Sequence, residues 1–220
     1  MRAFLLAAGL ATRLRPLTHQ RPKQLLPLPG GHKTLLDYHL QRLVLAGISE
    51  VVINVSAFYK EIKCYLLSKS YPISVVFSEE GHTPVHTATG VQRCLAYFKD
   101  EPFLLLSSDV WTDYPLSLLI DQSPEYAHIV LTPSQYSGDF GLSSTGELTL
   151  DQPSGVFAGI AKVHPRLFTK LPSPICGIGE VLRMHLEQGQ TLTGSTYLGP
   201  WMNLNTVNDY HQLIESPLLL

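Results

Sequence analysis

Cationic side chains crowd the start of the chain, just after a short apolar run that stops at Gly9. Among them are Arg13, Arg15 and Lys23. An apolar strand that runs into a tight loop presents backbone N–H groups to an anion. Arginine and lysine side chains add positive charge for a polyphosphate. We therefore expect a nucleotide site at the start of the chain.

The segment from residue 5 to residue 18 matches neither of the common phosphate-binding loops. It lacks GxxxxGK[ST], and it lacks GxGxxG because Leu10 and Ala11 follow Gly9. Taken alone, the pattern is equally compatible with a surface loop after an edge strand. The missing glycine spacing also disfavours a dehydrogenase-like dinucleotide site.

Short apolar runs alternate with amphipathic segments in the first half of the chain. Strands are expected over residues 2–7, 51–55, 73–77 and 103–106, and helices over residues 34–46, 57–68 and 87–98. Thr34 is the expected N-cap of the first helix, and Gly47 is its expected stop. This alternation predicts an α/β fold with a mostly parallel sheet and helices on both faces. Asp109, which follows the fourth strand, then lies with the first loop at the ligand-binding edge of the sheet.

The second half of the chain is less regular. Strands are expected over residues 127–132, 147–150 and 156–163, and helices over residues 177–188 and 206–215. No repeat, long linker or low-complexity segment interrupts it. We therefore expect one domain that spans residues 1–220.

The composition is that of an ordinary globular protein, with 45% apolar and 15% charged residues among 220. The formal net charge of -2 gives no basic field that would recruit nucleic acid. No apolar stretch reaches the roughly 18 to 20 residues of a membrane helix, so no membrane partner is expected. Cys64, Cys94 and Cys176 form no CxxC pair, which argues against a disulfide framework or zinc site and favours a reducing cytoplasm.

The opening segment resembles the signature of the sugar-1-phosphate nucleotidyltransferases, roughly LAAGxGTRLxPLT followed by PKxLLPV. Here it reads LAAGLATRLRPLT over residues 6–18 and PKQLLPL over residues 22–28. The resemblance continues in SDVWTDY over residues 108–114 and in GPW over residues 199–201, so it covers nearly the whole chain. It is greatest to the short N-acetylmuramate-1-phosphate uridylyltransferases, through residues 78–114 and the chain length. It implies a Rossmann-like, glycosyltransferase-A-like nucleotidyltransferase fold.

The resemblance also implies a reaction between a sugar 1-phosphate and a nucleoside triphosphate, with UTP as the preferred nucleotide. The sugar phosphate attacks the α-phosphorus in line, and the products are a nucleotide sugar and pyrophosphate. Such a reaction needs alignment of two anions and neutralisation of their charge. Mg²⁺ and basic side chains are therefore expected. The implied pathway is the recycling of cell-wall sugars.

The site residues carry over from the family pattern position by position. The nucleotide is expected to contact Leu6, Ala7, Ala8, Gly9, Ala11, Thr12, Arg13, Lys23, Gly90 and Ser108. Among these, Arg13 is expected on the β- and γ-phosphates and Lys23 on the α-phosphate, which makes them the catalytic pair. The substrate is expected near Glu80, Asp139 and Gly159, and Mg²⁺ near Asp109 and Asn203. The alternatives are that Arg13 and Lys23 are solvated loop charges and that Asp109 caps the next segment.

Five positions depart from the family pattern. Ala11 replaces a loop glycine, so its methyl crowds a phosphate unless the backbone φ is negative. Ala88 and Thr89 replace glycines, so a ligand would meet their Cβ atoms instead of bare backbone. Asn203 replaces a metal carboxylate, and Gly177 stands where a lysine for the sugar phosphate is expected.

These departures leave two hypotheses open. In the first, the protein is a working nucleotidyltransferase. In the second, it is a catalytically impaired nucleotide-binding or regulatory homologue of the same fold. Lys162 and Lys170 lie near the missing lysine in sequence. The base preference, the sugar and the oligomeric state stay open.

Overall fold

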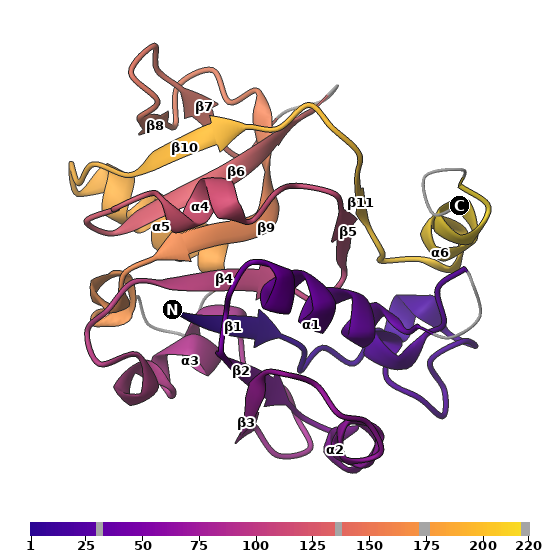
Figure 1. The fold of residues 1–220 in the computed structure, drawn as a ribbon. Helices are drawn as coiled ribbons and strands as arrows, with labels where there is room; N and C mark the ends of the chain where they lie inside the picture. The colour runs from indigo at the N-terminus through magenta and orange to yellow at the C-terminus, as the bar shows by residue number, and fades with distance from the viewer. Residues whose placement is uncertain (30–32, 135–137, 172–176, 217–220) are drawn as a thin grey trace.

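The computed structural model of the protein describes residues 1–29, 33–134, 138–171 and 177–216. Its centre is a seven-stranded sheet with the order β10-β6-β9-β4-β1-β2-β3 (Figure 1). The strands are β1 (Arg2–Leu6), β2 (Glu50–Val55), β3 (Ser74–Glu79), β4 (Phe103–Ser107), β6 (Ala127–Pro133), β9 (Gly155–Val163) and β10 (Thr193–Thr196). Within this sheet only β9 is reversed, because it is antiparallel to both β4 and β6. The expected mostly parallel sheet is confirmed.

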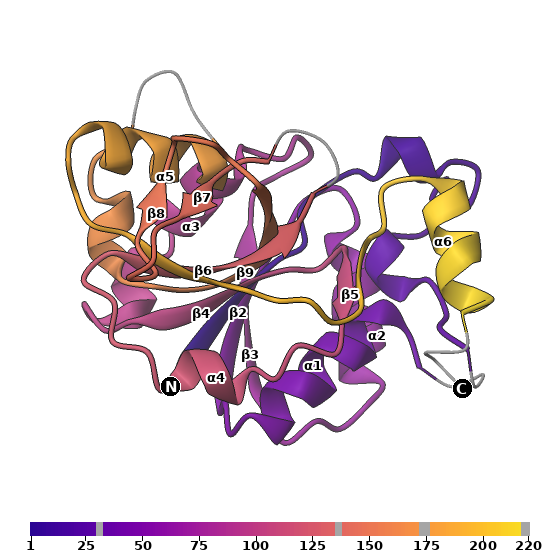
Figure 2. The same ribbon diagram turned by 90° about the horizontal axis from the view of Figure 1, so that it is seen from above.

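Helices cover both faces of the sheet, as expected (Figure 2). One face carries α3 (Thr87–Gln92) and α5 (Ile178–Glu187), and the other carries α1 (Leu35–Leu45), α2 (Tyr59–Leu67) and α4 (Ser117–Ile120). Successive side chains of a strand point to opposite faces of the sheet, so they pack into two separate hydrophobic cores. Phe4 packs in the core with α3 and α5, and Leu5 packs in the core with α1, α2 and α4. Both faces of the central strands are therefore buried, which explains their unbroken apolar sequences.

The first turn of α1 is fixed by the polar residues that the sequence places there. Thr34 caps the helix and forms a capping box with Asp37, whose carboxylate also accepts hydrogen bonds from the hydroxyls of Tyr65 and Tyr71 and from Lys69. Burial raises the pKa of Asp37, but these hydrogen bonds outweigh it and lower the pKa to about 2. The predicted N-cap at Thr34 is confirmed.

The helix expected over residues 87–98 is shorter than its apolar pattern indicates. It ends with α3 at Gln92 and gives way to a 3-10 turn, η3 (Leu95–Phe98). The helix contains Thr87, Thr89 and Gly90, which are poor helix formers, so little local preference extends it.

Several short elements that the sequence pattern did not predict complete the fold. They are the 3-10 helices η1 (Thr12–Leu14), η2 (Lys23–Leu25) and η4 (Pro165–Phe168), the strand pair of β5 (Val110–Thr112) with β11 (Trp201–Asn203), and strand β7 (Gly141–Leu142). Strand β7 pairs with β8 (Leu148–Thr149), which lies within the strand expected over residues 147–150. The last helix, α6 (Val207–Ile214), lies against η1 and η2 (Figure 1). Segments from both ends of the chain therefore meet beside the carboxyl edge of the sheet.

None of the helices in the described residues is long and apolar enough to cross a membrane. Cys64 is exposed and Cys94 is buried, and both are free thiols. Cys176 lies outside the described residues.

Candidate active site

The site lies where the strand order of the sheet reverses. After β1 the chain builds β2 and β3 on one side and then crosses to β4 on the other side of β1. The ends of β1 and β4 pair at Leu6 and Ser107, and the N–H of Ser108 donates to the carbonyl of Leu6 at 3.1 Å. Open α/β sheets bind ligands at such a reversal. The expected meeting of the first loop with the end of β4 is confirmed.

Side chains from other elements hold the backbone of the first loop. The N–H of Ala7 donates to Oδ1 of Asn54 at 2.7 Å, and the hydroxyl of Ser56 donates to the carbonyl of Ala8. Beyond this anchored part, Gly9 and Leu10 are exposed, and no described residue accepts a hydrogen bond from their N–H groups. Exposed, unpaired N–H groups are suited to binding phosphate oxygens.

Ala11 adopts a left-handed conformation, with φ 50° and ψ 42°. The alternative in which its backbone φ is negative is therefore wrong. A left-handed alanine costs roughly 1–2 kcal/mol compared with the right-handed form. The hydroxyl of Thr18 donates to the carbonyl of Ala11 at 2.8 Å and helps to hold this conformation. The loop thus keeps a glycine-type backbone without a glycine.

Lys23 and Asp109 form an ion pair across the strand reversal. Nζ of Lys23 lies 2.7 Å from Oδ2 of Asp109. The Lys23 side chain is 9% exposed and that of Asp109 is 27% exposed, so the pair is largely shielded from water. Neither residue is a solvated surface charge, which removes that alternative for Lys23.

Two buried residues that the sequence reading did not single out support this pair. Nε2 of Gln24 donates to the carbonyl of Ala7 at 3.0 Å and to the hydroxyl of Ser108 at 2.9 Å. Nε2 of His39 lies 3.2 Å from the carbonyl of Ser108. Burial, with Arg42 nearby, lowers the pKa of His39 to about 3, so its ring is neutral at physiological pH. The position of Gln24 directly after Lys23 is a sequence signal for its role, but nothing in the sequence around His39 marks its contact with Ser108.

The end of β11 lies beside Asp109. The N–H of Leu204 donates to the carbonyl of Asp109 at 2.7 Å. Oδ1 of Asn203 is buried and has no hydrogen-bond partner among the described residues. Those residues contain no cluster of three His, Cys, Asp or Glu side chains that could hold a metal ion. Asn203 pairs with Val110, which directly follows Asp109. Its unpaired amide oxygen and the Asp109 carboxylate are donors of the kind that Mg²⁺ takes, and Mg²⁺ completes its shell with water and phosphate.

Arg13 lies on the same side of the loop as β11. Its Nη2 donates to Oδ1 of Asn205 at 2.9 Å, and Arg13 is exposed whereas Asn205 is half-buried. Asn205 directly precedes Thr206, the N-cap of α6. The guanidinium of Arg13 is therefore held by a weak, solvent-accessible contact, from which a phosphate could release it.

Glu80 and Gly90 belong to the framework behind the first loop. One carboxylate oxygen of Glu80 accepts from Nδ2 of Asn54 at 2.8 Å, and the other accepts from the N–H of Val85 at 2.9 Å. A Cβ on Gly90 would lie 2.5 Å from Oε1 of Glu80. Asn54 thus links Glu80 to Ala7, and it is visible in the sequence as a polar residue within an apolar strand. Beside this framework, a cavity of about 360 Å³ is lined in part by Ser56 and Gly81.

Ala88 and Thr89 differ in what their side chains contact. Ala88 is fully buried in the core that contains Phe4 and Val91, so its methyl faces the protein. The expectation that a ligand would meet the Cβ of Ala88 is therefore wrong. Thr89 is half-buried.

The remaining expected substrate residues follow β9 along the same edge. Gly159 has φ +72°, and a Cβ there would lie 2.8 Å from Oγ of Ser107. Oδ2 of Asp139 accepts from the N–H of Phe157 at 3.0 Å, and its Oδ1 lies 3.8 Å from Nη2 of Arg183. Gly159 is thus adjacent to the end of β4, whereas Asp139 lies beside the start of β9.

The two lysines that lie near the missing cation in sequence have different surroundings. Nζ of Lys162 donates to the carbonyls of Ile120 and Gln122, at the edge of the sheet opposite to the site. Lys170 is exposed after η4. Gly177 caps α5, and the next N–H, of Ile178, donates to Oγ1 of Thr87 at 3.1 Å.

The sequence matches a family of known proteins. A profile of the family described as nucleotidyl transferase matches residues 2–151. An N-acetylmuramate alpha-1-phosphate uridylyltransferase from Neisseria meningitidis serogroup B is 31% identical over 220 residues, which cover 94% of this chain and 94% of that protein. The catalytic subunit beta of mannose-1-phosphate guanylyltransferase from Drosophila melanogaster is 27% identical, over 95% of this chain and 60% of that protein.

The fold is also found in solved structures. The UTP-bound UGPase from Acinetobacter baumannii superimposes with a TM-score of 0.79 over 99% of this chain and 95% of that one, at 16% identity. At that identity the likeness establishes the fold alone. The α/β architecture expected from the sequence is thus also found in this solved structure.

Proposed function

Because this chain belongs to the nucleotidyl transferase family, we propose that it transfers a nucleotidyl group to a sugar 1-phosphate. The products are a nucleotide sugar and pyrophosphate. UTP is the proposed nucleotide and Mg²⁺ the proposed cofactor. N-acetylmuramate 1-phosphate is the first sugar phosphate to test, since it appears in the name of the Neisseria relative.

The observation that carries this proposal is the Lys23–Asp109 pair at the strand reversal. It sets a buried ammonium 2.7 Å from a carboxylate, next to a loop with unpaired N–H groups. A triphosphate needs all three groups: N–H donors for its oxygens, a cation at the reacting phosphorus and a carboxylate for its metal ion. A surface loop with no ligand would leave such a pair exposed and weak.

The position of each residue determines its role in the proposed reaction. The N–H groups of Gly9 and Leu10 bind phosphate oxygens, and Arg13 leaves Asn205 to bind the outer phosphates. Lys23 leaves Asp109 and stabilises the charge that grows on the α-phosphate during attack. Asp109 and Asn203 hold the metal ion. Mg²⁺, when bound, neutralises the triphosphate and lowers the barrier to in-line displacement.

The alternative function is nucleotide binding without turnover. It is favoured by one observation, namely that Gly177 stands where the lysine is expected and that Lys162, a lysine nearby in sequence, is tied to backbone carbonyls. A phosphate-binding lysine contributes several kcal/mol to transition-state stabilisation, so its loss without replacement slows turnover by orders of magnitude.

A pyrophosphate-release assay separates the two functions. UTP, GTP, CTP and dTTP are each tested with N-acetylmuramate 1-phosphate, glucose 1-phosphate and mannose 1-phosphate. The proposal expects turnover with at least one pair, and loss of that turnover in Asp109→Ala. Nucleotide binding by calorimetry, with no turnover for any pair, would establish the alternative. A cytoplasmic location and a role in cell-wall sugar recycling belong to the proposal and depend on the sugar that this assay identifies.

A further inference from the structure

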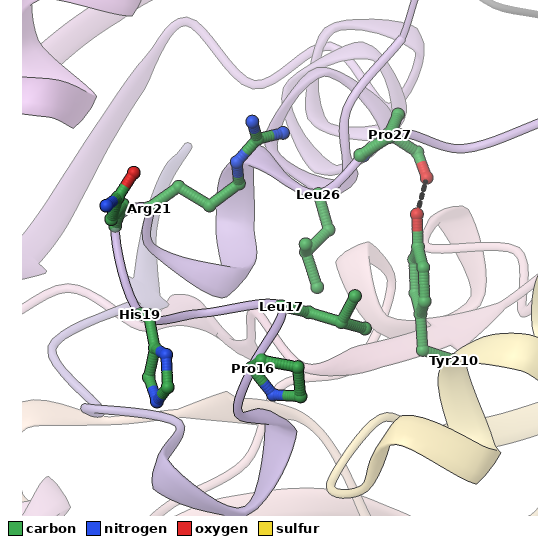
Figure 3. A pocket seen from close by; sticks show the side chains of 8 residues that line it. Pro16, Leu17, His19, Arg21, Leu26, Pro27 and Tyr210 are labelled. Atoms are coloured by element: carbon green, nitrogen blue, oxygen red, sulfur yellow. Dashed lines mark hydrogen bonds between the residues drawn. The ribbon is translucent and has the colours of Figure 1, made fainter.

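A second cavity lies apart from the proposed catalytic site. It has a volume of about 520 Å³ and opens between the segment after η1, the segment after η2 and helix α6 (Figure 3). This volume is within the range of roughly 300–1,000 Å³ that small-molecule sites occupy. Lys23, Asp109 and the first loop up to Gly9 do not line it. A ligand in this cavity and a nucleotide in the catalytic site therefore contact different residues.

Five of the eight residues that line the cavity are apolar or aromatic, and His19, Gln20 and Arg21 line the rest. Leu17, Leu26 and the ring of Tyr210 surround the cavity, together with two prolines, Pro16 and Pro27 (Figure 3). Tyr210 is fixed in place, because its hydroxyl donates to the carbonyl of Pro27 at 2.6 Å. Leu26 and Tyr210 are part of a small core cluster that also contains Leu14. The walls are therefore already formed and present a surface suited to a ring or a hydrocarbon body.

The polar groups of the cavity favour an anion. The Arg21 side chain extends along the side opposite to the Tyr210 ring (Figure 3). It is exposed, and no described residue forms an ion pair with it. None of the described residues that line the cavity carries a carboxylate, and the first 36 residues of the chain contain no Asp or Glu. Burial raises the pKa of Tyr210, and the positive charge of Arg21 opposes that rise.

From these walls and this unpaired cation we infer that the cavity is a second ligand site, which binds a small organic anion. The phosphate or carboxylate of the ligand pairs with the guanidinium of Arg21, which matches the planar geometry of either group. The ring or hydrocarbon body packs against Leu17, Leu26 and Tyr210.

Two contacts connect the proposed second site to the first loop of the catalytic site. Thr18, next to Leu17, donates to the carbonyl of Ala11. Helix α6, which carries Tyr210, begins beside Asn205, the partner of Arg13. The ligand thus touches both segments that hold the triphosphate side of the proposed site, without occupying it.

Calorimetry with simple probes tests the inference. Phenyl phosphate and benzoate carry a ring with each of the two anionic groups, while phenol and inorganic phosphate each lack one part. We expect saturable binding of phenyl phosphate or benzoate with a Kd of about 1 mM or tighter. The tighter of these two probes identifies the anionic group, and both control compounds bind at least about tenfold more weakly.

Two variants of one loop decide where the probe binds. Arg21→Gln weakens probe binding about tenfold, whereas Arg15→Gln leaves it within about twofold, because Arg15 is exposed but does not line the cavity. Both substitutions are at exposed side chains, and equal melting temperatures verify that the fold is kept. Equal weakening by both variants would mean a diffuse positive surface and would overturn the inference. So would the absence of saturable binding to the unmodified protein.

A titration with MgUTP present completes the test. The probe should bind with the same stoichiometry, since it does not use the nucleotide site. Displacement of the probe by MgUTP would overturn the inference. If the protein does not bind MgUTP at all, the proposed function fails. The titrations without nucleotide still show whether the second site binds the probe.

Discussion

Replacing Lys23 by glutamine should make the protein bind a free divalent cation more tightly. In the unliganded protein, Nζ of Lys23 donates to Oδ2 of Asp109 at 2.7 Å. A metal ion that arrives without a nucleotide must displace the ammonium from that oxygen. The glutamine side chain removes the competing charge and leaves the carboxylate available. Lys23, which binds the nucleotide in the proposed function, thus competes with the metal ion for Asp109 when no nucleotide is bound.

The size of the effect follows from the distance and exposure of the pair. Two charges about 4 Å apart attract by about 4 kcal/mol at an effective dielectric constant of 20, and exposed pairs contribute about 0–1 kcal/mol. With Lys23 9% exposed and Asp109 27% exposed, the pair lies between these limits. We expect about 1–2 kcal/mol, which corresponds to about tenfold in the Kd for the metal.

Electron paramagnetic resonance of Mn²⁺ measures the free-metal Kd directly, without turnover. Arg13→Gln is the matched control, because it removes one positive charge from the same region but leaves the Lys23–Asp109 pair intact. In the presence of UTP the order should reverse, with Lys23→Gln holding the metal–nucleotide complex more weakly than the unmodified protein. If Lys23→Gln binds Mn²⁺ no more tightly than Arg13→Gln does, the pair does not compete with the metal and the reasoning fails.

Three stability predictions follow from residues that hold the loop and its support. Ala11→Gly relieves the left-handed backbone and should raise the free energy of unfolding by up to about 1 kcal/mol in urea denaturation, after the greater chain entropy of glycine is subtracted; a loss of stability would contradict this. Asp37→Asn should cost about 2 kcal/mol at pH 7. Because the pKa of Asp37 is about 2 in the folded protein and its ordinary value is 3.8, this difference should disappear as the pH falls from 4 to 2; a pH-independent difference would refute the charge argument. The pKa of His39 is lowered from 6.5 to about 3, so the unfolded chain binds the extra proton between those values and the unmodified protein should lose stability on acidification there. Between pH 6.5 and pH 4, the melting temperature of His39→Gln should fall less than that of the unmodified protein. An equal fall in both proteins would contradict the lowered pKa of His39.

Local sequence patterns predicted the strands of the first half of the chain and the start of helix α1. The strands of the first half are apolar on both faces, and Thr34 carries the polar signal of a helix start, so both were predictable from neighbouring residues. Strands β5 and β11 are three residues each, too short for a periodic signal, and they pair across about 90 residues of sequence. Only the tertiary fold brings them together, and with them the expected metal position at Asn203.

The candidate site, like the fold, could be predicted from the sequence only in part. The family resemblance pointed to Arg13, Lys23 and Asp109 by type, but it contained nothing about their contacts with one another. The pairing of Lys23 with Asp109 depends on the crossing from β3 to β4, which no local pattern encodes. The backbone angle of Ala11 was likewise undetermined, because an alanine has no side-chain signal for a left-handed conformation.

The contact between the two ends of the chain has a consequence for how the protein is made. The hydroxyl of Tyr210 reaches the carbonyl of Pro27, 183 residues earlier, and Arg13 meets Asn205 at a separation of 192. During synthesis, β1 to β4 and β9 emerge well before this last helix. A nascent chain can therefore assemble most of the sheet while its first loop still lacks its lateral support. The ability to hold a nucleotide should therefore be acquired only after α6 has emerged, although the residues of the first loop are translated long before this helix.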